Sequence, residues 1–199
     1  AVHAVESWYY VSTHALMRWN LPVEPRHPGK HLGLKLAGRH LAEGQQAVNE
    51  AGLQPGRFVL IAPTATGLHH GKIKVWPYFD ALTRALQQRG YTVAMCPPLS
   101  EAEDARRNAP SALCLPPLNL GAFATLSHLA ALVICNDSGV SHLAAAANAR
   151  QLTLFGVTER ARTGPWSGNA TCLGSAQHWP SLAEVENQAC ALLHTDPGT

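Results

Sequence analysis

From residue 57 onward, short apolar runs alternate with stretches in which apolar residues recur at helical spacing. The apolar runs predict buried strands at 58–62, 92–96, 112–115, 131–135, 151–155 and near 171–173. The stretches between and after them predict helices at 77–89, 101–108, 120–130, 138–148 and 181–194. Strands that alternate with helices through short links are typical of a doubly wound parallel α/β sheet covered by helices.

Residues 1–55 lack this alternation. Apolar and aromatic residues at helical spacing predict one helix over 5–19 and a second over about 38–52, and prolines between them mark an extended connector. We therefore divide the chain into a helical hinge or linker segment, 1–55, and an α/β domain, 56–199. The chain begins at Ala1 without a methionine, already inside amphipathic sequence, so we expect a segment upstream of it.

Composition narrows the class of protein. A chain of 199 residues with 46% hydrophobic and 14% charged residues is long enough for one full core. A net charge of +2 and sparse aromatics argue against a nucleic-acid partner. No apolar stretch reaches the roughly 20 residues of a membrane span. The five cysteines form no Cys-x-x-Cys pair, which favours reduced thiols in a cytoplasmic protein.

Several familiar functional motifs are incomplete or absent in this sequence. The segment 67–73 resembles a phosphate-binding P-loop, but its spacing is one residue short and Ile73 stands where a magnesium-binding hydroxyl is needed. No Gly-x-Gly-x-x-Gly follows the first strand, and no Gly-x-Ser-x-Gly elbow is present. No His-Glu-x-x-His helix is present, and His27 and His31, although four residues apart, are separated by Pro28 and Gly29, which disfavour a helix, so we predict no metal.

Polar residues follow the predicted strands where each ends, and in a parallel sheet those ends share one edge. Asp137-Ser138-Gly139 leads directly from a strand into an alanine-rich helix, which suits either a simple helix cap or an anion site. Thr64 and Thr66 end the first strand and suit either a phosphate or a turn. Lys74 precedes Trp76-Pro77, which opens a helix, although Lys72 is an alternative phosphate contact.

Together these motifs resemble the heptosyltransferases, which are glycosyltransferase family nine of lipopolysaccharide core assembly. The matching residues are Lys74 with Trp76-Pro77, Glu101, Pro116 with Leu118, Asp137-Ser138-Gly139 with His142, and Phe155-Gly156 with Thr158. The opening His3-Ala4-Val5-Glu6 is similar to the segment that leads out of the first domain in that family.

The resemblance implies a GT-B enzyme, in which two Rossmann-like domains face each other across a cleft, and residues 56–199 as its second, nucleotide-sugar-binding domain. It assigns Thr64, Thr66, Lys74, Ser138 and Gly139 to the donor diphosphate, Glu101 and Leu118 to the ribose and base, and Asp137 and His142 to the donor sugar.

The same resemblance implies an inverting, metal-independent transfer that uses no cofactor. Its donor is a nucleoside-diphosphate sugar, with ADP-heptose expected, and its acceptor is a lipid-linked saccharide at the inner face of the inner membrane. The general base and the acceptor site belong to the first domain, so we expect no catalytic residue in this chain and no activity from it alone. Two alternatives stay open: the same fold with a different sugar nucleotide, and a non-catalytic nucleotide-binding or regulatory module.

Overall fold

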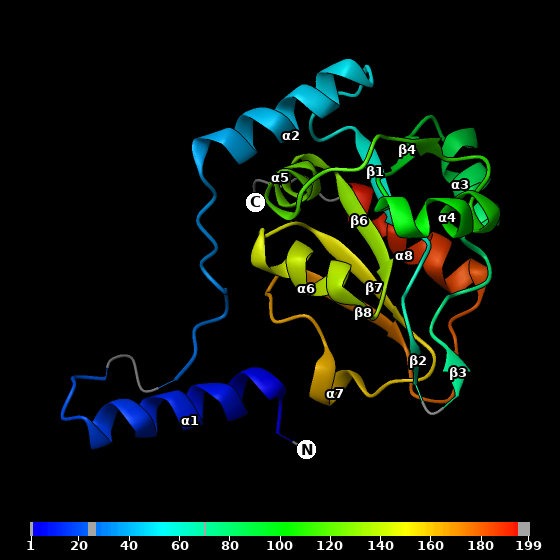
Figure 1. The fold of residues 1–199 in the computed structure, drawn as a ribbon. Helices are drawn as coiled ribbons and strands as arrows, with labels where there is room; N and C mark the ends of the chain where they lie inside the picture. The colour runs from blue at the N-terminus through cyan, green and yellow to red at the C-terminus, as the bar shows by residue number, and fades with distance from the viewer. Residues whose placement is uncertain (1, 24–26, 70, 195–199) are drawn as a thin grey trace.

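The computed structural model describes residues 2–23, 27–69 and 71–194 (Figure 1). The helices are α1 (Ala4–Arg18), α2 (Gly38–Glu50), α3 (Phe79–Gln88), the 3-10 helix η1 (Leu99–Glu101), α4 (Ala102–Asn108), α5 (Leu120–Leu129), α6 (Gly139–Ala146), α7 (Arg160–Thr163) and α8 (Leu182–His194). The strands are β1 (Phe58–Ala62), β2 (Leu68–His69), β3 (Lys72–Ile73), β4 (Thr92–Met95), β5 (Leu113–Cys114), β6 (Leu132–Asn136), β7 (Gln151–Phe155) and β8 (Ala170–Gly174).

Six strands form one sheet in the order β5-β4-β1-β6-β7-β8, and all five neighbouring pairs are parallel. The chain winds outward from β1 to one edge, returns, and then winds from β6 to the other edge. This confirms the predicted doubly wound, Rossmann-like sheet. The strand order reverses between β1 and β6, where the parallel register pairs Ala62 with Cys135. In open α/β sheets, that reversal opens a crevice at the carboxyl ends of the strands.

The period of two along each strand produces two apolar cores, one on each face of the sheet. In β1, Val59 and Ile61 pack with α3, α4 and α8, whereas Phe58 and Leu60 pack with α2, α5 and α6. All five residues of β1 are buried, as are all five of β6 and of β7. Continuous burial on both faces explains why these strands read as unbroken apolar runs in the sequence.

Helix α2 lies against α5 on the outside of the sheet (Figure 1). The two helices approach closely at Gly44, where an added Cβ would lie 2.5 Å from the Thr125 Cβ and 2.8 Å from the Ala122 carbonyl oxygen. The Thr125 hydroxyl also donates to the His40 carbonyl oxygen at 3.1 Å. Part of the predicted linker segment 1–55 thus packs on the sheet body, while the division between domains at residue 56 stays a prediction.

We call residues 2–23 and 27–37 the N-terminal arm. Its helix α1 extends along the lower left of Figure 1, beside the body, and contains no buried residue. The arm contacts the body through His3, whose Nε2 lies 2.9 Å from the Gly164 carbonyl oxygen. Trp166 adds a ring contact with His3 at 4.8 Å and donates from Nε1 to the Gly29 carbonyl oxygen at 2.7 Å.

The predicted strands and long helices are all present, with ends that differ by at most two residues. Three short features were not predicted, namely the β2–β3 hairpin, the 3-10 helix η1 and the four-residue helix α7. The five cysteines are unpaired thiols, as expected. Within the described ranges, no helix combines the length and the apolar composition that crossing a membrane requires.

Candidate functional site

A cavity of about 570 Å³ opens at the carboxyl edge of the sheet, where the strand order reverses. One wall is the end of β1 and the turn after it, through Thr66, and the opposite wall is the first turns of α6. The turn that follows β4 and the start of α5 close the remaining side. Its volume falls within the range of small-molecule sites in proteins.

Asn136, the last residue of β6, ties the cavity walls together. Its side-chain amide donates to the carbonyl oxygens of Ala62 and Thr64, at 3.3 and 3.2 Å, and its Oδ1 accepts from the Trp76 N–H at 2.9 Å. Because Asn136 is fully buried, these bonds satisfy groups that no water can reach. Sequence analysis gave Asn136 no role, although a polar residue at the end of a buried strand is a usable signal.

Two predicted site residues meet across the cavity. The hydroxyl of Thr64 donates to Oε2 of Glu101, which joins the end of β1 to the turn after β4. Both side chains are half-buried and line the cavity, together with Thr66 and Leu118. Glu101 is the one acidic side chain among the lining residues, so its carboxylate is placed to accept hydrogen bonds from a bound molecule.

The start of α6 presents its backbone to the same cavity. Ser138 precedes the helix in an extended conformation, with φ −151° and ψ −179°, and its side chain makes no capping hydrogen bond. Its Oγ is buried and has no hydrogen-bond partner among the described residues. A Cβ at Gly139 would meet nothing within 4 Å, so the first turn is open to a ligand. The uncapped N–H groups and the helix dipole favour an anion there.

Asp137 and Lys74 lie beside the cavity rather than among its lining residues. The buried Asp137 carboxylate accepts from the Thr158 hydroxyl at 2.6 Å and from the Thr163 hydroxyl at 3.3 Å. The Lys74 Nζ is 3.5 Å from the Asp137 carbonyl oxygen. Lys74 is half-buried and Lys72 is exposed, so Lys74 is the lysine that reaches the start of α6.

Of the nine predicted site residues, seven line this cavity: Thr64, Thr66, Glu101, Leu118, Ser138, Gly139 and His142. Sequence analysis missed the apolar wall, where Cys96, Leu120 and Phe123 lie beside Leu118. Burial raises the pKa of Cys96 to about 11, so its thiol is neutral at physiological pH. No motif marks these residues, since the sequence pattern of apolar side chains is the same in a core and in a pocket wall.

Among the residues that the structure describes, no three His, Cys, Asp or Glu side chains gather where they could hold a metal ion. Charge at the cavity therefore comes from Glu101, from the start of α6 and from Lys74 behind it. The acidic end and the electropositive end lie on different elements. The cavity lining is thus polarised, with the acidic group on the β4 turn, the electropositive group at the start of α6 and an apolar wall between the β4 turn and α5.

A doubly wound sheet with a cavity at its switch point and a helix start in the cavity wall is characteristic of a Rossmann-like domain. The model of glycosyltransferase family 9 (heptosyltransferase) matches residues 1–192. The chain belongs to this family.

Relatives are consistent with this membership. Lipooligosaccharide heptosyltransferase 2 of Haemophilus influenzae is 31% identical over 118 residues, which are 54% of this chain and 34% of that protein. The family 9 glycosyl transferase of Veillonella parvula superposes with a TM-score of 0.76 at 17% identity, over 97% of this chain and 60% of that one. E. coli heptosyltransferase WaaC with ADP superposes with a TM-score of 0.62 at 21% identity, over 75% of this chain and 48% of that one. The chain thus spans about a third of the curated relative and about half of these two solved chains.

Proposed function

We propose that residues 56–199 form the donor-binding domain of an inverting, metal-independent glycosyltransferase that uses a nucleoside-diphosphate sugar. The observation that carries this proposal is the polarised cavity at the switch point, with Glu101 on one side and the open start of α6 on the other. A nucleotide has hydroxyl donors on its ribose and negative charge on its diphosphate, so its two parts match the two ends.

The diphosphate belongs at the start of α6, in this proposal. The N–H groups of Ser138 and Gly139 and the ammonium of Lys74 supply donors and positive charge there. Transfer of the sugar builds negative charge on the leaving diphosphate. A lysine and a helix N-terminus that are already in place stabilise this charge, which is the role that Mg²⁺ fills in other enzymes. No metal ion is then required.

The ribose and the base occupy the other end. Glu101 accepts hydrogen bonds from the ribose hydroxyls, and the backbone near Leu118 and the apolar wall meet the base. We propose ADP-heptose as the donor because the family is named for heptosyl transfer and its relative WaaC was solved with ADP.

The sugar lies beyond the diphosphate, toward His142 and Asp137. His142 is exposed and lines the cavity, so it is available to the sugar hydroxyls. The Asp137 carboxylate, which two threonine hydroxyls hold in place, offsets the positive charge that develops on the sugar ring during transfer. Attack by the acceptor hydroxyl on the opposite face then inverts the anomeric centre.

The acceptor and the general base come from a first domain, as the shorter span of this chain relative to its relatives suggests. We propose a lipid-linked saccharide acceptor at the inner face of the membrane, in line with the lipooligosaccharide named for the Haemophilus relative. On this account, residues 1–199 alone bind the donor and transfer nothing.

Calorimetric titration with ADP, UDP, GDP and ADP-heptose tests the proposal. We expect ADP and ADP-heptose to bind more tightly than UDP and GDP, with or without EDTA. The variants Asp137→Asn and Asp137→Ala should weaken the binding of ADP-heptose more than the binding of ADP, because they alter the sugar end of the site. A strict Mg²⁺ requirement would contradict metal independence, and equal binding of all four would contradict a nucleotide-specific cavity.

A further inference from the structure

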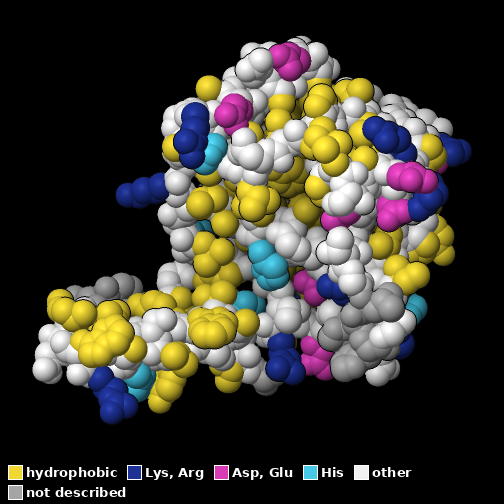
Figure 2. Space-filling view, in the orientation of Figure 1, with side chains coloured by type: hydrophobic (Ala, Val, Ile, Leu, Met, Phe, Trp, Pro, Cys, Tyr) yellow, Lys and Arg dark blue, Asp and Glu magenta, His cyan; other side chains and the backbone are white. Residues whose placement is uncertain are grey.

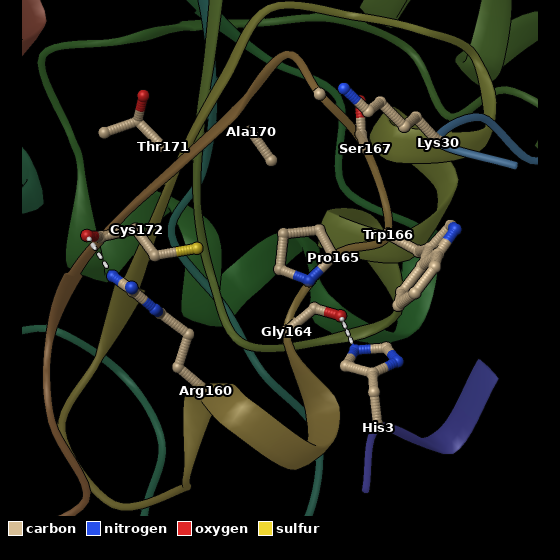
Figure 3. A pocket seen from close by; sticks show the side chains of 11 residues that line it. His3, Lys30, Arg160, Gly164, Pro165, Trp166, Ser167, Ala170, Thr171 and Cys172 are labelled. Carbon is tan, nitrogen blue, oxygen red and sulfur yellow. Dashed lines mark hydrogen bonds between the residues drawn. The ribbon is translucent and has the colours of Figure 1, made fainter. Parts of the chain in front are cut away.

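A second cavity, of about 580 Å³, lies between the N-terminal arm and the segment that joins α7 to β8 (Figure 3). Its lining side chains from the arm are His3 and Lys30, and those from the body include Arg160, Trp166 and Thr171. We call this cavity the edge pocket, since β8 is the last strand of the sheet. It shares no lining residue with the cavity at the β1–β6 reversal, which is proposed to hold the donor and which we call the donor cavity.

The side chains around the edge pocket are basic. Lys30 and Arg160 contribute two positive charges, and no Asp or Glu is among the lining residues. Burial raises the pKa of Cys172 to about 11, so this thiol adds no negative charge at neutral pH. Glu6, the acid among the described residues of the arm, accepts from the His3 N–H at the first turn of α1 and does not line the pocket. A ligand in this pocket therefore meets a surplus of positive charge.

The two cations approach from opposite sides. In Figure 3, Lys30 extends beside Ser167, and Arg160 lies at the other end, beside Cys172. Arg160 donates from Nη1 to the Cys172 carbonyl oxygen at 3.3 Å, and a guanidinium carries five N–H donors in all. This geometry orients the guanidinium while leaving it capacity for the paired acceptors of a phosphate or carboxylate.

Between the cations, the wall combines apolar faces with a hydroxyl. Pro165 and the indole of Trp166 form flat apolar faces, and Ser167 supplies a hydroxyl, which accepts from the Asn169 N–H at 3.1 Å and keeps its own proton to donate. Trp166 is held in place by its hydrogen bond to Gly29 and its contact with His3. A sugar ring has apolar C–H faces and hydroxyl edges that match such a wall, and a fixed aromatic side chain lowers the entropic cost of binding.

We propose that the edge pocket binds an anionic sugar, a hexose-sized ring that carries a phosphate or a carboxylate. The anion pairs with Arg160, the ring packs on Trp166, and Lys30 reaches over the ring from the arm. Because residues of the arm and of the body both take part, the bound sugar fastens the arm to the edge of the sheet.

Calorimetric titration of the full chain at low salt tests this site, with ADP present at saturation to occupy the donor cavity. The probes are glucose 6-phosphate, glucuronate, glucose and inorganic phosphate. We expect glucose 6-phosphate or glucuronate to bind, and neutral glucose and inorganic phosphate to bind at least tenfold more weakly. Arg160→Gln should lower the affinity for the anionic sugar by roughly tenfold or more, which is the effect expected from the loss of one charged hydrogen bond.

Arg162→Gln is the matched control, because Arg162 is exposed on the same helix α7 and does not line the pocket. We expect it to bind the anionic sugar as the unaltered chain does. Equal losses from the two variants, binding of inorganic phosphate as tight as that of the sugar phosphate, or no binding by any anionic sugar would each overturn the proposal. A repeat of the titration without ADP in which the sugar binds tenfold more tightly would also overturn it, because the sugar and ADP would then compete for one site.

Discussion

Strand β1 and helix α1 show how differently this chain holds two of its regions in place. All five residues of β1 are buried, whereas none of the 15 residues of α1 is. Trp8 and Trp19, the largest side chains of that region, are 71% and 69% exposed, and Figure 2 shows apolar side chains along the surface of the arm. The sheet body is stabilised by burial on two faces, and the arm is held by a few directed contacts at His3 and Trp166.

Because of this difference, the global stability of the body and the local opening of the arm should depend on different residues. The donor cavity is built on buried strand ends, so damage to the core should damage the cavity as well. The position of the arm depends on hydrogen bonds that can break without unfolding the sheet. Changes in the body should therefore alter global stability, and changes in the arm should alter local opening.

The largest expected effect is in the core of the body. Leu60→Ala removes a fully buried side chain from β1 and should lower the free energy of unfolding by about 2–5 kcal/mol. Met17→Ala, at a half-exposed position of α1, should change it by less than about 0.5 kcal/mol. Urea unfolding measures both variants. A similar loss at Met17 would mean that the arm is part of the same cooperative core.

Glu101 tests whether the cavity walls bind the nucleotide. Glu101→Ala removes the carboxylate proposed to accept from the ribose and should weaken ADP binding by about 1.5–3 kcal/mol. Glu103→Ala is the control, because Glu103 is exposed on α4 and pairs with Arg107 outside the cavity. Calorimetry on both variants decides the point, and equal ADP affinity in the two would contradict the ribose assignment.

Gly44 tests whether α2 is part of the cooperatively folded sheet body or is only loosely attached to it, as the arm is. Gly44→Ala places a Cβ against Thr125 and the Ala122 carbonyl oxygen, so it should cost about 1–3 kcal/mol of stability through overpacking. Gly38→Ala, at the first residue of the same helix, meets nothing within 4 Å and should be neutral or slightly stabilising. If thermal unfolding shows no difference between them, α2 does not depend on its contact with α5.

The smallest expected effect concerns the arm. Trp166→Phe keeps an aromatic ring but loses the hydrogen bond to Gly29, which is worth about 0.5–1.5 kcal/mol. Hydrogen exchange of the arm amides should become faster, with global stability unchanged. Trp19→Phe, at an exposed position of the arm, should leave exchange as it was. A fall in global stability in Trp166→Phe would contradict the separation of arm and body.

Much of the body could be predicted from the sequence, since buried parallel strands leave continuous apolar runs and their ends share one edge. That edge does carry Thr64, Glu101 and Ser138 in one cavity. The order of the strands could not be predicted from the pattern, because a run such as 58–62 does not specify its neighbours. The location of the cavity at the β1–β6 reversal thus required the structure.

Other features leave no periodic signal at all. Strands β2 and β3 have two residues each, too short to show alternation, so in the sequence 67–73 shows only an imperfect likeness to a P-loop. His70, which lies inside that motif, is outside the described residues. The sequence also left Lys72 and Lys74 as alternatives. The structure separates them because β3 exposes Lys72, while the chain then turns inward and brings Lys74 near Asp137.

That pair of lysines provides the most direct test of the central claim, that the start of α6 and Lys74 together hold a diphosphate. ADP is titrated by calorimetry into the unaltered chain, Lys74→Ala and Lys72→Ala. We predict that Lys74→Ala lowers the affinity for ADP by about tenfold or more, through loss of a charged contact. Lys72→Ala should change this affinity by less than about twofold. Unchanged ADP binding in Lys74→Ala, or a larger loss in Lys72→Ala, would contradict the account.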